Sequence, residues 1–168
     1  MKSYRIKDVK SFMARVLTMD TFDDFLLSEA KIFGKASFHL TGIAAEGFCN
    51  EEPKDESGYV PYKKLREVCL SMMRGKQTPE NFTMMFLLPR EETEKLIASS
   101  DCDIPKEDVE QLSFLVRFKD GELFVITGSA YRVFTMDRSL NDAWDRWVEL
   151  FLQKTGIAYL DARESFTF

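Results

Sequence analysis

The segment from residue 112 to residue 136 constrains the fold more than any other part of the chain. Residues 112–118 and 123–127 are two largely apolar runs, and Asp120-Gly121 separates them. An Asp-Gly pair between two apolar runs of strand length is the strongest local signal for a tight β-hairpin. A second turn at Gly128-Ser129 and a strand over 131–136 would extend the hairpin to a three-stranded antiparallel meander.

Other segments predict further strands and three amphipathic helices. Residues 4–6, 25–33, 36–42 and 82–88 are typical of strands, and Gly34-Lys35 suits a hairpin turn between the second and third of them. Apolar residues recur at helical spacing over 9–18, 61–74 and 139–155. Asp8 and Ser139 are suitable N-caps for the first and last helices, and Gly156 ends the last one.

We therefore predict an α+β fold in which helices pack on one face of an antiparallel sheet and the other face is more polar. A length of 168 residues favours a single domain. The 15 Phe and 8 Met residues would fill the layer between helices and sheet. Residues 90–111 form an acidic insertion with short helices, and 139–155 is an added C-terminal helix. The alternative architecture is a helix-grip sheet, in which that last helix crosses a curved meander and encloses an apolar pocket.

The two early helices suggest an internal repeat. The apolar positions of the first helix, moved by 56 residues, coincide with those of the second: Val9, Phe12, Met13, Val16 and Leu17 with Leu65, Val68, Cys69, Met72 and Met73. Lys7 maps to Lys63 and Lys10 to Arg66 in the same way. The predicted units, 3–58 and 59–136, each contain a strand, a basic helix and antiparallel strands.

This pattern over residues 3–136 resembles one domain of the DNA processivity clamps, the proliferating-cell-nuclear-antigen and bacterial beta-clamp group. The resemblance implies helices that turn a basic face toward a DNA backbone. The acidic insertion and the C-terminal helix depart from the clamp pattern. The chain also resembles a small family of clostridial-type bacterial proteins of unknown function, through the segments at 8–13, 20–27 and 75–79. That second resemblance implies no activity.

Charge is distributed unevenly along the chain. The whole chain carries a net charge of −5, whereas residues 7–17 carry +2 and residues 63–76 carry +4, which leaves −11 elsewhere. If the two helices lie side by side, they present a basic surface that could contact phosphates without reading sequence. The candidate nucleic-acid-binding residues are Lys7, Lys10, Lys63, Arg66 and Arg74. Solvated outer faces of ordinary helices are the simpler interpretation.

Composition argues against the common catalytic classes. The chain has one His, His39, and three separated Cys residues, so it offers no zinc motif and no disulfide framework. We expect no metal site, no cofactor and no enzyme activity. Instead we expect a cytoplasmic binding module without a membrane span, whose partner is nucleic acid or protein. The alternative is a protein that binds small apolar ligands in a pocket beside Trp144 and Trp147.

Overall fold

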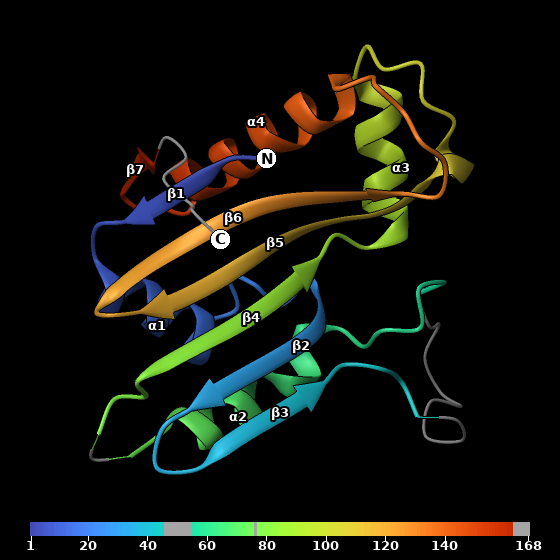
Figure 1. Cartoon of the computed structure of the whole chain (residues 1–168). Coiled ribbons are helices and arrows are strands. Elements are labelled where there is room, and N and C mark those ends of the chain that lie inside the picture. The colour runs from blue at the N-terminus through green and yellow to red at the C-terminus, as the bar shows by residue number, and fades with distance from the viewer. Residues whose placement is uncertain (46–54, 76, 163–168) are drawn as a thin grey trace.

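Antiparallel pairing joins all the strands into one sheet. The computed structural model describes residues 1–45, 55–75 and 77–162, and within them the strand order is β3-β2-β4-β5-β6-β1-β7 (Figure 1). The strands are β1 (Ser3–Ile6), β2 (Leu26–Phe33), β3 (Ser37–Thr41), β4 (Asn81–Leu87), β5 (Val109–Lys119), β6 (Glu122–Tyr131) and β7 (Tyr159–Ala162). The helices are α1 (Val9–Thr18), α2 (Tyr62–Met73), α3 (Arg90–Ser99) and α4 (Ser139–Lys154).

The hairpin predicted at Asp120-Gly121 is confirmed. Both residues have positive φ angles, 53° and 79°, and they join β5 directly to β6. The second turn, predicted at Gly128-Ser129, is wrong. Gly128 pairs with Ser113 inside β6, where an added Cβ would approach Ser113 Oγ to 3.0 Å. Gly128 therefore allows β5 and β6 to approach each other closely at this position. The chain leaves the sheet only after Tyr131.

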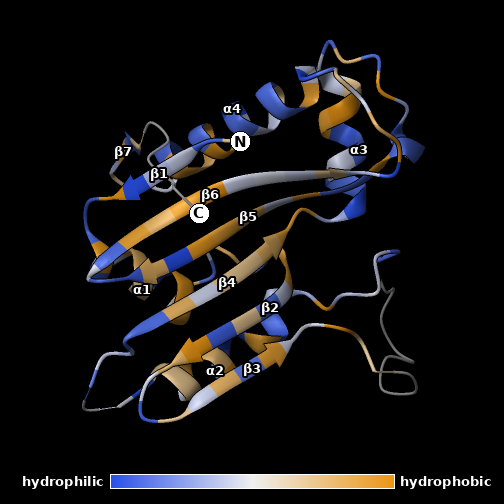
Figure 2. Cartoon of the chain, in the orientation of Figure 1, coloured by the Kyte–Doolittle hydropathy of each residue, from blue (hydrophilic) through white to orange (hydrophobic). Residues whose placement is uncertain are grey.

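One face of the sheet carries the hydrophobic core. Alternate residues along β4, β5 and β6 are buried on this face, and helices α1, α2 and α4 pack against it. Phe22 and Phe25, which precede β2, lie at the centre of an aromatic cluster with Phe86, Phe114 and Phe151. These phenylalanines therefore fill the layer between the helices and the sheet, as predicted. In Figure 2, which is coloured by hydropathy, hydrophobic and hydrophilic residues follow one another along the strands.

Buried hydrogen bonds fix the helices to one another and to the sheet. The Tyr62 hydroxyl of α2 donates to the carbonyl of Val16 in α1 over 2.8 Å, and burial raises the pKa of this phenol. In α4, the Trp144 indole donates to the carbonyl of Ser113 over 2.9 Å. The Asp145 carboxylate of α4 accepts a hydrogen bond from Thr127 of β6. The two predicted basic helices therefore lie side by side. Helix α4 packs on the same face of the sheet, against β5 and β6.

The α+β class, the antiparallel sheet and the C-terminal helix are confirmed. The segment 90–111 packs on the sheet as α3, a short 3₁₀ turn over Lys106–Asp108, and the first residues of β5. The sequence over 44–58 is typical of an acidic loop, and residues 46–54 of it lie outside the described part of the chain. The segment after Gly156 contributes the edge strand β7, which pairs with β1.

The strand pairing also bears on the proposed repeat. β1 opens the first unit and pairs with β6, which ends the second unit. Tyr59 opens the second unit and forms an antiparallel bridge to Ile43, just after β3, which ends the first. The 56-residue repeat itself stays a prediction. Among the described residues, no helix combines the length and the apolar character that a bilayer crossing requires.

Candidate nucleic-acid interface

The five basic residues predicted to bind nucleic acid lie on or beside α1 and α2 in different local surroundings. Lys7 precedes α1, and Lys10 lies exposed on its first turn. Lys63 and Arg74 lie at opposite ends of α2, separated by roughly 16 Å of helix. Lys76, counted in the charge of this region, lies outside the described residues. The two helices are adjacent, and these cations lie at several positions along them.

Arg66 is occupied by a structural contact. Its guanidinium donates to both carboxylate oxygens of Asp23, over 2.9 Å and 3.0 Å, and also to the carbonyl of Met19. The Asp23 side chain is only 10% exposed and lies in the loop between α1 and β2. Arg66 therefore fastens α2 to this loop, and its charge is neutralised by Asp23.

Lys63 lies in acidic surroundings. It lines a groove with the carboxylates of Asp23, Asp24, Asp55, Glu56, Glu91 and Glu94. Arg90 is in the same groove, where its backbone N–H donates to Asp55 and its side chain pairs with Glu94. A phosphate backbone approaching Lys63 would meet these carboxylates, which oppose its binding.

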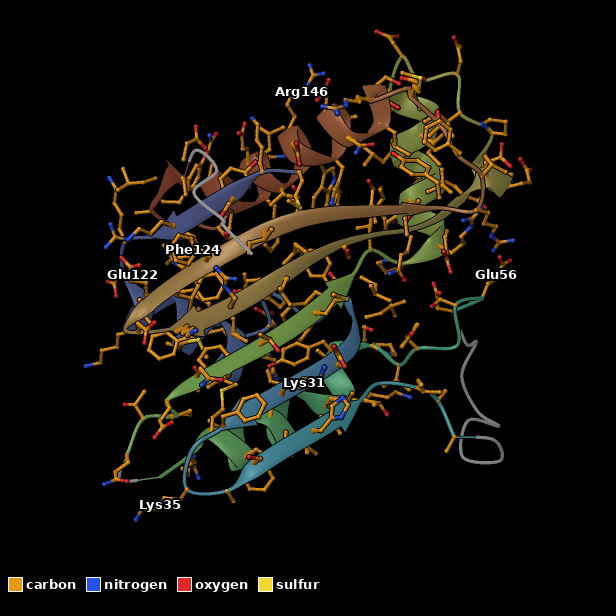
Figure 3. The ribbon with its side chains drawn as sticks, in the orientation of Figure 1. Lys31, Lys35, Glu56, Glu122, Phe124 and Arg146 are labelled. Carbon is orange, nitrogen blue, oxygen red and sulfur yellow. The ribbon has the colours of Figure 1, made fainter. Side chains whose placement is uncertain are left out.

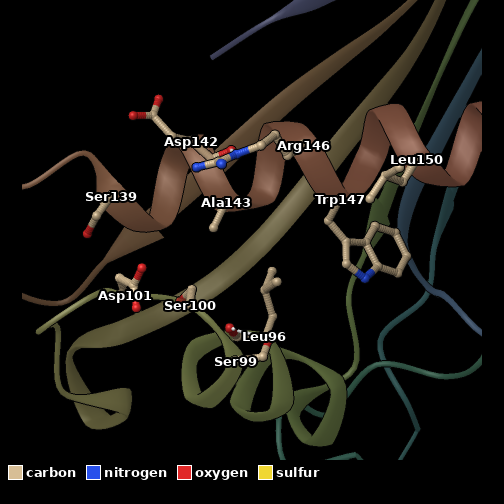
Figure 4. A pocket seen from close by; sticks show the side chains of 10 residues that line it. All are labelled: Leu96, Ser99, Ser100, Asp101, Ser139, Asp142, Ala143, Arg146, Trp147 and Leu150. Carbon is tan, nitrogen blue, oxygen red and sulfur yellow. Dashed lines mark hydrogen bonds between the residues drawn. The ribbon is translucent and has the colours of Figure 1, made fainter.

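The two tryptophans predicted to line a pocket have different positions. Trp144 is buried and stacks on Trp147 with ring centroids 5.2 Å apart, so it fills the layer between α4 and the sheet. Trp147 also lines a cavity of about 420 Å³ between α3 and α4, shown in Figure 4. Leu96 and Leu150 form the apolar end of this cavity, and Arg146, Asp142 and Asp101 surround the other end.

The opposite face of the sheet is the surface that sequence reasoning missed. No helix of the described residues crosses it, and Figure 1 views the sheet from this side with α1 and α2 behind. Residues on this open face alternate with the buried ones, so Lys31 lies between Ala30 and Ile32, and Phe124 between Leu123 and Val125. Figure 3 labels Lys31 and Phe124 on the ribbon.

Strand register aligns basic residues in one row across this open face. The cross-strand partners run from β3 to β7 as His39, Lys31, Thr83, Arg117, Phe124, Arg5 and Leu160. We call this set the basic row. Six steps of about 4.8 Å give it a length of roughly 29 Å. The row next to it contains the apolar side chains Met85, Leu115 and Ile126.

Local contacts hold the basic row in place. The Arg117 guanidinium lies 5.9 Å from the centroid of the Phe124 ring, a cation–π contact. Glu29 accepts from His39 over 3.0 Å and pairs with Lys31 over 3.3 Å. Burial opposes ionisation of Glu29, but the hydrogen bonds from His39 and Lys31 outweigh it and lower its pKa. Arg5 pairs with Glu122 over 2.6 Å.

A sequence signal for this row exists in the β5–β6 hairpin. Once Asp120-Gly121 is taken as a two-residue turn, Arg117 and Phe124 are equidistant from it and must pair across the hairpin. The rest of the row depends on β4 lying beside β2 and on β1 lying beside β6, which are long-range pairings that no local pattern specifies. Among the described residues, no group of three His, Cys, Asp or Glu side chains is placed to hold a metal ion.

Comparison with known proteins places the chain in a family. No curated protein sequence and no solved structure matches this chain. The model of a family of unknown function, DUF5721, matches residues 15–160, which include everything from the middle of α1 to the start of β7. The predicted resemblance to a family of unknown function is therefore confirmed, and this chain belongs to the family DUF5721.

Proposed function

We propose that this protein is a non-enzymatic cytoplasmic module that binds nucleic acid through the phosphate backbone, with the open face of the sheet as its binding surface. The observation that carries the proposal is the basic row, which aligns Lys31, Arg117 and Arg5 across the sheet. Phosphate contacts require cations at suitable spacing and no sequence-specific readout. A row of cations across the sheet can contact successive phosphates of a polyanion.

The charge of this face supports the proposal. The basic row contains no carboxylate, and Lys119 adds a cation in the row beside it. Among the described residues, Glu29 pairs with Lys31 and Glu122 pairs with Arg5 on this face. The described side chains Lys31, Arg117, Arg5, Lys119, Glu29 and Glu122 together carry +2 on a chain of −5. Exposed ion pairs contribute at most about 1 kcal/mol each, so phosphates can replace these carboxylates.

The cations of α1 and α2 are the second candidate surface for the same function. Lys7, Lys10 and Arg74 are exposed there, which suits backbone contacts. Arg66 is bound by Asp23, and Lys63 is surrounded by carboxylates. We therefore assign the main interface to the open face.

The clamp-like resemblance remains part of this proposal. The reciprocal pairing, in which β1 joins the last strand of the second unit and Tyr59 joins the end of the first, supports a pseudo-two-fold relation between the units. In processivity clamps the helices face DNA. Our proposal instead assigns the interface to the open face of the sheet, so the binding surface differs from that of the clamps.

A second candidate function is the binding of a small amphipathic ligand in the cavity between α3 and α4. The observation that favours it is Trp147, whose ring lines the cavity beside Leu96 and Leu150 while Arg146 lies at the polar end. A ligand there should change tryptophan fluorescence, and Trp147→Phe should remove most of that change. An unaltered spectrum with a panel of amphipathic carboxylates would exclude this function.

The main proposal is tested by charge reversal on two faces. Binding of a fluorescent 20-nucleotide single strand is measured by anisotropy at low salt. Lys31→Glu with Arg117→Glu should weaken binding at least about tenfold, because two phosphate contacts become repulsive. The matched control, Lys10→Glu with Arg74→Glu, makes the same charge change on the helices and should have little effect. Absence of wild-type binding contradicts the proposal, and the reverse pattern assigns the interface to the helices.

A further inference from the structure

The loop between β6 and α4, residues 132–138, exposes large apolar side chains, and we call it the apolar tip. Phe134 is 92% exposed, Met136 is 86% exposed and Val133 is 48% exposed. Single exposed apolar residues are common on protein surfaces, but several of them together mark an interaction site. The phosphate contacts of the basic row make no use of this loop, so its exposed residues indicate a separate partner.

Hydrogen bonds hold the apolar tip in its exposed position. At its start, the N–H of Arg132 donates to the carbonyl of Asp108 over 2.8 Å. At its end, the N–H of Asp137 donates to Thr135 Oγ1 over 3.1 Å, and the Asp137 carboxylate accepts from the N–H of Ser139 over 2.8 Å. The apolar side chains therefore project from a loop that is held at both ends, so binding a partner requires little further ordering.

The cavity between α3 and α4 lies close to the apolar tip. Ser139 lines this cavity five residues after Phe134, so their Cα atoms are at most about 18 Å apart. A cavity of roughly 150 Å³ can hold a benzene ring, and this cavity measures about 420 Å³. Its apolar end is formed by Leu96, Trp147 and Leu150 (Figure 4). An apolar projection and a cavity large enough to receive it are therefore near each other on the same chain.

The charges of the apolar tip and the cavity are complementary. The tip has two arginines and one carboxylate, a net charge of +1: Arg132, Arg138 and Asp137. The lining of the cavity has two carboxylates and one arginine, a net charge of −1: Asp101, Asp142 and Arg146. A second copy of the chain thus supplies both an apolar group for the cavity and the opposite charge beside it.

We infer that two copies of this chain associate about a two-fold axis, with the Phe134 ring of each copy inserted into the α3–α4 cavity of the other. A two-fold interface uses the same patch on both copies, so a projection and its receiving cavity must lie near each other on one chain. The apolar tip and the cavity meet this condition. A small ligand would enter the cavity of the dimer only by displacing this ring. The inference goes beyond the proposed function and is independent of it, because no residue of the basic row takes part.

The inference is tested by sedimentation velocity of the full chain, from low micromolar to nearly millimolar concentration. Wild-type protein should show a monomer–dimer equilibrium. Phe134→Ser should weaken the dimer about a hundredfold, because a two-fold dimer loses this contact twice and each loss costs about tenfold.

The matched control is Phe38→Ser, the same substitution on the edge strand β3. The Phe38 ring is 42% exposed and belongs neither to the apolar tip nor to the cavity lining. This control should leave the dimer unchanged, and thermal unfolding verifies that every variant is folded.

Mixing two variants tests whether the insertion is reciprocal. Ala143→Phe places a ring inside the cavity and should weaken the dimer as much as Phe134→Ser does. In a mixture of the two variants, the intact cavity of one copy accepts Phe134 of the other, so one of the two contacts is retained. The mixture should therefore dimerise about tenfold more tightly than either variant alone.

A wild type that stays monomeric throughout, equal dimer affinities for wild type and Phe134→Ser, equal losses for Phe134→Ser and Phe38→Ser, or a mixture no tighter than its components would each overturn the inference. Binding of monomeric wild type to phosphatidylcholine vesicles, lost with Phe134→Ser, would also overturn it and assign the apolar tip to a membrane surface.

Discussion

Arg66 shows, at the scale of single residues, that a charged side chain can lie outside the apolar face of a helix and still hold the fold together. Its guanidinium contacts both oxygens of a largely buried carboxylate, Asp23. Removing one member of such a pair leaves the other without its partner. Helical angles give the direction of a side chain, but they do not show which loop residue lies there.

We expect Arg66→Ala to lower the free energy of unfolding by about 1–2 kcal/mol, since the pair is only partly buried. Asp23→Asn should cost a similar amount, and the double variant should cost less than the two single losses combined. Urea unfolding measures all three. Lys10→Ala, at an exposed position of α1, should change stability by less than about 0.5 kcal/mol. Strictly additive losses would contradict the structural assignment of Arg66.

Glu29 gives a pH-dependent prediction at the same scale. Burial opposes its charge, but hydrogen bonds from His39 and Lys31 lower its pKa in the folded state below the ordinary value of 4.5. A lowered pKa means that the carboxylate stabilises the folded state above pH 4.5, and that this contribution is lost as pH falls through the folded-state value.

Glu29→Gln should therefore be less stable than wild type near neutral pH, by about 0.5 kcal/mol because the site is partly solvated. The difference should shrink as the pH of the unfolding series is lowered from 6 through 4.5 and below. A stability difference that stays constant over this range would show that the ionised carboxylate contributes nothing.

At the scale of elements, local sequence pattern located nearly all the helices and strands. It failed where an element depends on its neighbours. Gly128-Ser129 has turn composition, yet β5 extends far enough back, to Val109, to keep this dipeptide paired. Likewise β7 has no clear local signal, and it exists because β1 offers an edge. Cross-strand pairing overrides turn and strand propensity in both cases.

Gly42 marks the junction where the β2–β3 hairpin meets the segment that leads into α2. Its N–H donates to Ser28, and its carbonyl accepts from Val60, both over 2.9 Å. A Cβ at this position would lie 1.7 Å from the backbone oxygen of Leu27, so the strands would have to separate.

Gly42→Ala should accordingly cost at least about 3 kcal/mol, which lowers Tm by roughly 10 °C. Gly34→Ala, in the adjoining hairpin turn, is the matched control, because the nearest atom to its Cβ would be 3.8 Å away. Differential scanning calorimetry compares the two variants with wild type. Equal Tm values for Gly42→Ala and Gly34→Ala would show that the junction is not tightly packed.

At the scale of the whole molecule, the sheet separates two surfaces of different character. One face holds the aromatic core under α1, α2 and α4, and the other presents the basic row. The sequence predicted a more polar second face and the excess of basic residues on the helices. It could not predict the basic row, because Lys31, Arg117 and Arg5 belong to strands that become neighbours only through long-range pairing.

The salt dependence of single-strand binding tests the central claim most directly. Four cations on the open face, Lys31, Arg117, Arg5 and Lys119, predict a slope of about −3 for the logarithm of the association constant against the logarithm of salt concentration. Arg117→Gln should reduce the size of this slope by about 0.7, whereas Lys10→Gln should leave it unchanged. A wild-type slope near zero, or a slope that responds to Lys10→Gln and not to Arg117→Gln, would contradict the account.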